Sequence, residues 1–304
     1  MNWFFIALIG SLFYASTNHI DKYLISRYLK NREIGSLIIF SSIFSVFALP
    51  IIFFIRPEVF SVTLIQGVVL TLAGMMTVIA LLLYFYALLE DEATNVVPFY
   101  QTIPIFAFIL GYIVLGETVT STQIIAALVI IVGATTLSLE FNGNSIRFKG
   151  KVVLFMLLAS FLYAVSSVIF KLVALEEGFW LSTFWSLVGK VALGSFFLIA
   201  IPIYRNQFLT VLKENKVRIL ALNSINETVS IIADGLVGFA TLLAPIAIVL
   251  LAGSFQPVFV LLIGITITIF LPHISQESIS KKHILQKVFA ISLIMVGSYF
   301  LLGN

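Results

Sequence analysis

The sequence predicts an all-α integral membrane protein in which ten transmembrane helices form two inverted five-helix repeats. Three observations predict this fold: an apolar composition, ten apolar segments of membrane-spanning length, and an internal repeat. Of the 304 residues, 61% are hydrophobic and 10% are charged. A soluble chain carries roughly 25% charged residues and under half apolar ones, so this composition excludes a soluble globular protein.

The composition also excludes several kinds of chemistry. The chain has no cysteine, which rules out a thiolate nucleophile, a disulfide and a cysteine-ligated metal. Its three histidines, at positions 19, 273 and 283, match no metal-binding spacing. The net charge is +3, and its basic residues form small clusters between apolar runs, unlike a nucleic-acid surface. We therefore expect no cofactor and no nucleic-acid partner.

The apolar segments give the expected helices, because a bilayer core requires about 20 residues of helix. They cover residues 3–22, 34–55, 65–89, 94–115, 120–139, 151–174, 180–203, 217–239, 242–271 and 284–302. The segments 65–89 and 242–271 are longer than necessary, so a tilt, a break or a re-entrant start is expected in them. Six prolines within the segments are expected to mark bends near a cavity: Pro50, Pro98, Pro104, Pro202, Pro245 and Pro257.

The basic residues predict the orientation, since short cytoplasmic loops are enriched in Lys and Arg. Arg56 alone falls on the side of the two termini. The opposite side carries Arg27, Lys30, Arg32, Arg147, Lys149, Lys151, Arg205, Lys213, Lys216, Arg218, Lys281, Lys282 and Lys287. That side is expected to be cytoplasmic, which places both termini outside the cell membrane.

An internal repeat relates the two halves of the chain. Residues 11–22 and 160–171 share five identical pairs at a constant offset: Ser11/Ser160, Tyr14/Tyr163, Ala15/Ala164, Ile20/Ile169 and Lys22/Lys171. A second match joins residues 104–106 to residues 257–259, followed by Gly111 and Gly264. The halves 1–140 and 150–304 each hold five predicted helices, and an odd number gives them opposite orientations. Inverted repeats are typical of transporters that bind their substrate at the repeat interface.

Short motifs in both halves resemble the EamA family of the drug/metabolite transporter superfamily. The first half carries Pro98, Pro104, Gly111 and the run Leu115-Gly116-Glu117, and the second carries Ala244-Pro245-Ile246-Ala247, Gln256-Pro257 and Gly264. The second half has no Gly-Glu pair after Ile269, and family members more often carry their basic loops on the side of the termini. The resemblance implies a ten-helix basket around a central cavity. It also implies a secondary carrier that moves small metabolites, amino acids or drugs, often outward.

Two polar stripes occupy repeat-related helices. Residues at positions 0, 3, 7 and 11 of a helix share one face, which gives the sets Ser11, Tyr14, Asn18, Lys22 and Ser160, Tyr163, Ser167, Lys171. These stripes either line a cavity or make hydrogen bonds between helices. The two lysines either act as gates or anion contacts, or extend to the nearer membrane interface.

The eighth segment carries a third polar face, formed by Asn223, Glu227, Ser230 and Asp234, with Asn226 beside it. Glu227 lies about 15 Å from the start of its segment, near the bilayer midplane. A carboxylate at that depth is expected to bind a proton or to pair with a cation. Glu227 is therefore a candidate proton carrier or counter-ion for a cationic substrate. Lys190 in the seventh segment is the expected partner of either Glu227 or Asp234.

Other polar residues give weaker signals. Gln101 and Gln256 precede paired prolines and either present amides to the cavity or join helices. His19 and Asp21 are expected to be solvated at the interface. Tyr84 and Tyr86 are candidate cavity or interface aromatics. Three lysines and a histidine near the last segment indicate an anchor to anionic membrane lipid: Lys281, Lys282, His283 and Lys287.

The leading hypothesis is a secondary transporter of a small metabolite, amino-acid-like or drug-like, that works as an exporter by alternating access. Protons are the candidate coupling ion, and polar residues of both charges favour a zwitterionic substrate. A flippase for a lipid-linked intermediate and a passive pore are the alternatives. An enzyme is disfavoured, because the sequence contains no nucleophile triad or metal-ligand set. Nothing in the sequence predicts an oligomeric state.

Overall fold

The computed structural model describes residues 2–28, 34–90, 96–138, 150–214, 216–270 and 281–302. Within these ranges the regular elements are helices, without strands. The α-helices are α1 (Asn2–Tyr28), α2 (Ile34–Phe44), α3 (Ala48–Ile55), α4 (Leu64–Glu90), α6 (Ile103–Leu115), α7 (Ser121–Ser138), α8 (Gly150–Glu177), α9 (Phe179–Ala200), α10 (Pro202–Glu214), α11 (Lys216–Thr241), α12 (Ile246–Leu251), α13 (Gln256–Phe270) and α14 (Lys281–Leu302). The 3₁₀ turns are η1 (Ser45–Phe47), η2 (Pro57–Phe60), η3 (Val97–Thr102) and η4 (Ala252–Phe255).

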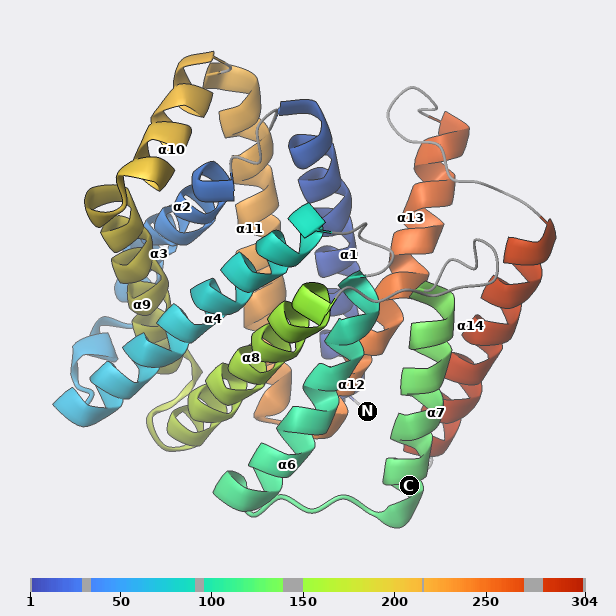
Figure 1. Ribbon diagram of the computed structural model, residues 1–304. Coiled ribbons are helices and arrows are strands. Elements are labelled where there is room, and N and C mark those ends of the chain that lie inside the picture. Colours follow the sequence, from blue (N-terminus) through green and yellow to red (C-terminus); the bar gives the residue numbers. More distant parts are fainter. Residues whose placement is uncertain are drawn as a thin grey trace.

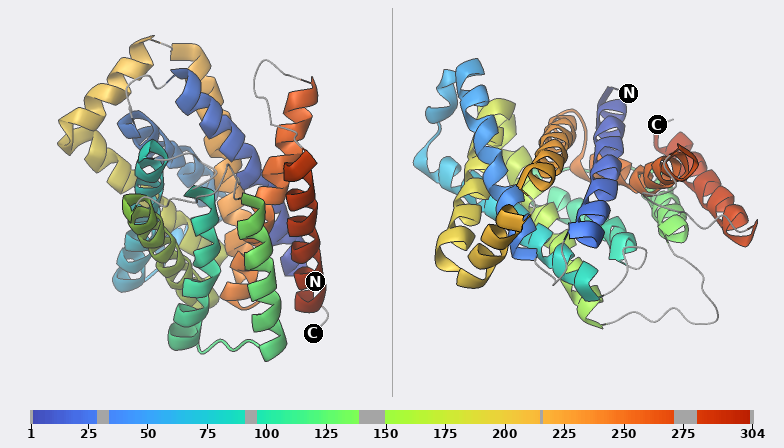
Figure 2. Two further views of the ribbon diagram at one scale, coloured as in Figure 1. Left: turned by 45° about the vertical axis from the view of Figure 1, so that its right-hand side comes forward. Right: turned by 90° about the horizontal axis from the view of Figure 1, so that it is seen from above.

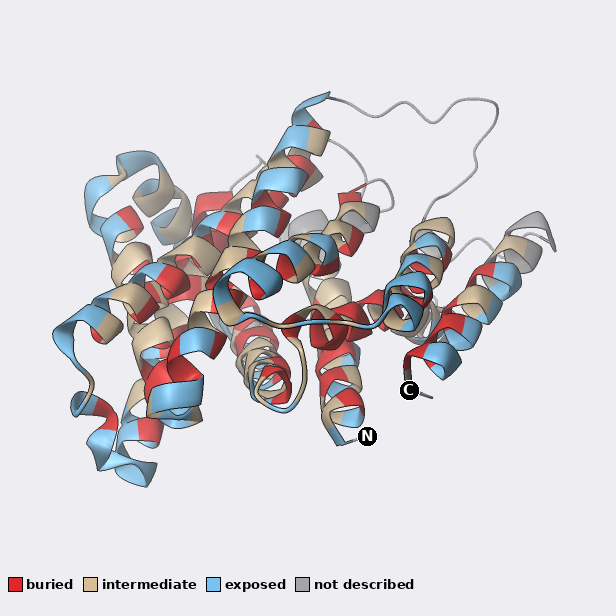
Figure 3. Ribbon diagram, turned by 90° about the horizontal axis from the view of Figure 1, so that it is seen from below, coloured by how far each residue is buried: buried red, intermediate tan, exposed pale blue. Residues whose placement is uncertain are grey.

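The helices form a bundle whose outer surface is apolar. Among the described residues, five segments are long and apolar enough to cross a membrane: Ile34–Ile55, Leu64–Glu90, Gly150–Glu177, Phe179–Ala200 and Ile246–Phe270. The bundle exposes many large apolar side chains, including Phe54, Leu64, Ile199 and Phe270, while buried residues lie where helices meet (Figure 3). A surface of this kind faces lipid. The prediction of an all-α, multi-pass membrane protein is confirmed.

Prolines in the described helices stand in first turns or at N-caps, where a missing N–H leaves no hydrogen bond unmade. Pro98, Pro104 and Pro257 are the second residues of η3, α6 and α13, respectively. The long segment predicted at 242–271 is broken twice, by a turn before α12 and by η4. The other long segment is the unbroken helix α4. The two breaks at η3 and η4 lie near the centre of the bundle.

Helix α10 was not predicted, because residues 204–216 were taken as a connection and Pro202 as a bend within a span. Ile201 is instead extended, with φ −110° and ψ 94°, and ends α9. Pro202 then begins a separate helix that packs on α2 and α9. Its polar and apolar residues are mixed, so a search for long apolar runs does not detect it.

The packing places two groups of helices around a central region (Figures 1 and 2). Helix α4 packs against α8 and α9, and α1 packs against α11 and α13. Helices α7 and α14 form one edge of the bundle, and α2, α3, α9 and α10 form the opposite edge. Helix α1 begins and α14 ends at the same end of the bundle. The packing is uneven, because α4 is in close contact with α9 whereas α2 touches α11 only slightly.

The close contact between α4 and α9 depends on two glycines. A Cβ atom on Gly74 would lie 1.9 Å from the carbonyl oxygen of Ser186, and one on Gly189 would lie 2.0 Å from that of Thr71. The two backbones therefore touch, and an alanine at either position requires the helices to move apart.

Gly74→Ala is expected to lower the free energy of unfolding by about 1–3 kcal/mol, the usual cost of overpacking. Gly67→Ala is the matched control in the same helix, since its Cβ would have no neighbour closer than 3.5 Å. It is expected to preserve or raise stability, because alanine favours helix over glycine by about 1 kcal/mol. Thermal unfolding of both variants in detergent measures the difference, and equal stability of the two would contradict the assigned packing.

Candidate functional site: a central polar cavity

A cavity of about 230 Å³ lies in the middle of the bundle. It is lined by residues of α1, α2, α4, α8, α9 and α11, and by η3, η4 and the residues around them. The lining includes nine of the residues singled out from the sequence: Tyr14, Asn18, Gln101, Tyr163, Lys190, Glu227, Ser230, Asp234 and Gln256. The polar faces expected on the first, sixth and eighth segments therefore meet in one place.

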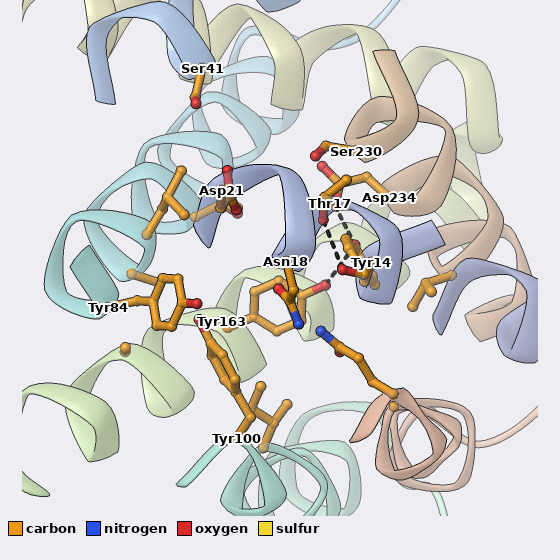
Figure 4. Close-up of a pocket in the computed structure, with 18 of the residues that line it drawn as sticks. Tyr14, Thr17, Asn18, Asp21, Ser41, Tyr84, Tyr100, Tyr163, Ser230 and Asp234 are labelled. Atoms are coloured by element: carbon orange, nitrogen blue, oxygen red, sulfur yellow. Dashed lines mark hydrogen bonds between the residues drawn. The ribbon is translucent and has the colours of Figure 1, made fainter. Parts of the chain in front are cut away.

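An ion pair between Lys190 and Asp234 lies at the wall of this cavity. The Lys190 Nζ is 2.5 Å from Asp234 Oδ2. The Tyr14 hydroxyl donates to Asp234 Oδ1 and lies 3.3 Å from the Tyr163 hydroxyl (Figure 4). The alternative partners left open for Lys190 are thus resolved in favour of Asp234. The Asp234 carboxylate thus contacts both a cation and a hydroxyl group, and hydrogen bonds to a charged group are stronger than those between neutral groups.

A second, smaller cavity of about 100 Å³ adjoins the first. The two share Tyr163, Lys190 and Asp234 among their lining residues, so the ion pair stands between them. Hydroxyl groups from α4, α8, α9 and α11 dominate the polar lining of the smaller cavity: Thr77, Ser166, Ser167, Thr183, Ser186 and Thr241.

Two further carboxylates line the main cavity. Asp21 accepts a hydrogen bond of 2.7 Å from the Asn226 amide, and Glu227 accepts one of 2.6 Å from the Ser41 hydroxyl. Glu227 is 8% exposed. Among the described side chains, the ion pairs are those of Lys171 with Glu117 and of Lys190 with Asp234. Neither Asp21 nor Glu227 has a basic side chain from the described residues in ion-pair contact.

Aromatic side chains form another part of the wall. The ring centroids of Tyr84 and Tyr100 are 5.3 Å apart. Tyr163 and Asp21 line the same cavity as these two tyrosines. In Figure 4 the three tyrosine rings lie around Asn18, with Asp21 nearby. The wall therefore combines flat aromatic faces with negative charge.

A second ion pair lies at the end of the bundle where α6 and α8 finish. The Lys171 ammonium pairs with Glu117 and donates 2.7 Å to the carbonyl oxygen of Ala244. Glu117 Oε2 accepts a 2.7 Å bond from the backbone N–H of Ile246, the first residue of α12. The pair therefore holds both sides of the turn between α11 and α12. A carboxylate at a helix N-terminus is favourable, because the free N–H groups there carry partial positive charge.

The position of Glu117 follows from the residue before it. Gly116 has φ +65°, the left-handed conformation that glycine adopts without strain. The Glu117 N–H returns to the Gly111 carbonyl oxygen at 3.1 Å, which closes the end of α6. This turn directs the Glu117 carboxylate back towards α8 and α12. The motif that carries the family resemblance in the first half thus builds an ion-pair site.

Several hydrogen bonds join residues whose separations equal the repeat offsets. Tyr14 meets Tyr163, 149 residues away, and Ser254 donates to Gln101, 153 residues away, at 2.5 Å. Ser11 donates to the carbonyl oxygen of Ala252 at 2.9 Å. The corresponding Ser160 donates to that of Phe99 at 3.2 Å, and these two acceptors are themselves 153 residues apart.

Four of the residues singled out from the sequence are not in the main cavity. Ser167 lines the smaller cavity and donates to Tyr163 O of its own helix. Lys171 is buried in its pair with Glu117. Asn223 lies on the expected face of α11, but that end of the face is covered, and it lines a small space with Leu24, Phe40 and Phe208. The Lys22 side chain lies outside the described residues.

The sequence analysis missed other lining residues. Asp21 was expected to be solvated at the interface, and Asn226 was placed beside the polar face. Ser41 lies in an apolar segment directly before Ser42, and two adjacent serines do not show the spacing of a polar helix face. Tyr100 is adjacent to Gln101 and lies between Pro98 and Pro104. The prolines that singled out Gln101 could therefore have indicated Tyr100 as well. Outside the cavity, the ion-pair role of Glu117 was also missed, since Glu117 was noted only as part of a family motif.

Comparisons with known proteins agree with the fold and with the expected family. The model of the EamA-like transporter family matches residues 1–139. No curated protein sequence matches the chain. Twenty-eight solved chains match in structure. One of them carries the description "Crystal structure of protein". It has a TM-score of 0.67 and 12% sequence identity to this chain, and the match covers 99% of this chain and 95% of the solved chain. At that identity the likeness shows the fold alone. The resemblance to the EamA-like transporter family that the sequence motifs indicated is therefore confirmed over residues 1–139.

Proposed function

We propose that the protein is a secondary transporter of a small metabolite, acting as an exporter by alternating access around the central cavity. The observation that carries the proposal is a polar, charge-lined cavity in the middle of a bundle whose outer surface is apolar. Charged residues inside a membrane bundle are expensive, and they mark substrate or ion pathways. The family match supports a small solute as substrate.

The proposal includes two inverted repeats, residues 1–140 and 150–304. Equivalent residues can touch one another only near a two-fold axis, as in an isologous interface. The Tyr14–Tyr163 and Gln101–Ser254 contacts support such an axis through the centre of the cavity. The matching bonds of Ser11 and Ser160 to η4 and η3 support it independently.

The uneven packing of the repeats supports alternating access. Under the repeat relation α4 corresponds to α11 and α9 corresponds to α2. The pair α4–α9 is in close contact, whereas the corresponding pair α2–α11 is nearly separate. Exchange of these two arrangements would expose the cavity to the opposite side, as expected for inverted repeats that move around a fixed site. The Lys171–Glu117 pair would hold the present arrangement closed at the end where the termini lie.

Glu227 is the proposed carrier of the coupling proton. It is buried in the cavity wall and accepts a hydrogen bond from Ser41 on α2, the helix that is nearly separate from α11. Protonation would remove a negative charge from this junction. Binding and release of a proton there would thus be linked to the approach of α2 and α11.

The small volume of the cavity favours a metabolite over a lipid-linked substrate. Pockets for drug-sized ligands hold about 300–1,000 Å³, whereas this cavity holds about 230 Å³. A flippase or an open pore would require a larger or a continuous space.

Glu227→Gln is expected to abolish transport or to uncouple it from the proton gradient, because the amide cannot bind and release a proton. Metabolites in spent medium and in cell extract would be compared between cells making equal amounts of wild type, the variant and Glu58→Gln, an exposed control outside the cavity. The wild type and the control should move a solute that the variant does not. Transport by Glu227→Gln with unchanged dependence on the pH gradient would remove Glu227 from the mechanism.

The orientation is a separate part of the proposal. The excess of basic residues on the loops opposite the termini supports both termini lying outside the cell membrane. Tags at residues 1 and 304 should therefore bind antibody on intact cells. Binding that requires permeabilised cells would reverse the orientation.

A further inference from the structure

The main cavity carries an uneven charge. Its described lining includes Asp21, Glu227 and Asp234 but one basic residue, Lys190. That lysine is already paired with Asp234, which also receives the Tyr14 hydroxyl. Among the described residues, Asp21 and Glu227 accept hydrogen bonds only from neutral groups, the Asn226 amide and the Ser41 hydroxyl. As far as the structure describes the chain, this part of the cavity has no basic side chain of its own, and a ligand could supply the positive charge.

The same part of the cavity has unused hydrogen-bond acceptors. An ionised carboxylate can accept about four hydrogen bonds, and one is formed at each of Asp21 and Glu227 by the described groups. Within the described residues, the side-chain oxygen of Asn226 is buried without a hydrogen-bond partner, and the residue is 3% exposed. Buried polar atoms are normally paired, so an orphaned acceptor indicates a missing donor. All three groups call for N–H donors.

The aromatic wall suits the same kind of ligand. Tyr84 and Tyr100 form a tilted pair of rings and line the same cavity as Asp21. An ammonium or guanidinium group is attracted to such ring faces within about 6 Å. Apolar lining residues such as Leu81 and Phe85 offer contact to an uncharged body. A negative pole and flat apolar surfaces thus adjoin each other (Figure 4).

We propose that the cavity binds organic cations, in which an ammonium or guanidinium group contacts Asp21, Asn226 and Glu227 and a flat apolar part lies against Tyr84 and Tyr100. The inference rests on the proposed transport function and names its substrate class. It replaces the zwitterion favoured by the sequence, because a substrate carboxylate would find Lys190 already neutralised by Asp234 and would be repelled by Asp21 and Glu227.

The test uses purified full-length protein and four probes that share a phenyl ring but differ in charge. Calorimetric titration near neutral pH would compare 2-phenylethylammonium, phenylalanine, 3-phenylpropanoate and 2-phenylethanol, the cation, zwitterion, anion and neutral form. The cation should bind at least about tenfold more tightly than each of the others, because only the cation presents its ammonium group to the carboxylates without a negative charge of its own. Equal or tighter binding of the zwitterion or the anion, or no binding of the cation, would overturn the proposal.

Substitutions locate the site. Asp21→Asn and Glu227→Gln keep the shape of each side chain and should each weaken cation binding about tenfold or more. Glu58→Gln, which removes an exposed carboxylate outside the cavity, should leave it unchanged. Full-affinity binding by both cavity variants would place the cation elsewhere and contradict the assignment. The wild-type probe series decides the charge preference even where a substitution impairs folding.

Flux measurements separate this inference from the proposed function. In vesicles containing the protein, uptake of 2-phenylethylammonium above the level of protein-free vesicles supports both. Binding without uptake would support the cation site and contradict transport. Export of a neutral or anionic solute, with no binding of the cation, would support transport and contradict the cation site.

Discussion

The ion pair between Lys190 and Asp234 is the interaction on which the rest of the site depends. A single charged residue in the middle of a transmembrane helix costs about 2.5–3.5 kcal/mol on insertion scales, and pairing offsets much of that cost. Lys190 pairs with Asp234, which also accepts a hydrogen bond from the Tyr14 hydroxyl. Lys190 therefore forms no ion pair with the other cavity carboxylates, Asp21 and Glu227. The pair also stands where the two cavities meet, so a solute passing between them must displace or pass it.

Among the described residues, an ion pair links helices at one end of the bundle and has no counterpart at the other end. At the end of α6, the left-handed Gly116 places Glu117 against Lys171 and the first N–H of α12. The second half has no glutamate at the corresponding position, where α13 ends in Ile269 and Phe270. If the two halves are inverted repeats, as proposed, an ion pair at one end gives the protein a preference for one of its two arrangements. In the proposed mechanism, that preference closes the cavity on the side of the termini in the unloaded protein.

Much of this arrangement follows from the sequence, since long apolar runs predict helices and polar positions with helical spacing predict a shared face. The stripe through Tyr14 and Asn18 and the face through Glu227 and Asp234 both line the cavity. Helical spacing does not say which neighbour covers a face, which is why Asn223 lies on the expected face yet outside the cavity. Asp21 was misjudged for the same reason: its distance along α1 indicated the interface, but α11 supplies Asn226 beside it. Helix α10 was missed because its apolar residues do not form a long run.

The central claim is that close packing alternates between α4–α9 and α2–α11, and distances between spin labels test it most directly. The chain has no native cysteine, so labels can be placed in pairs on an otherwise unchanged sequence. One pair would join Leu64 of α4 to Trp180 of α9, and the other Phe40 of α2 to Leu220 of α11. Upon addition of a transported solute, the account predicts a longer first distance together with a shorter second distance. Two distances that stay fixed, or that change in the same direction, would contradict it.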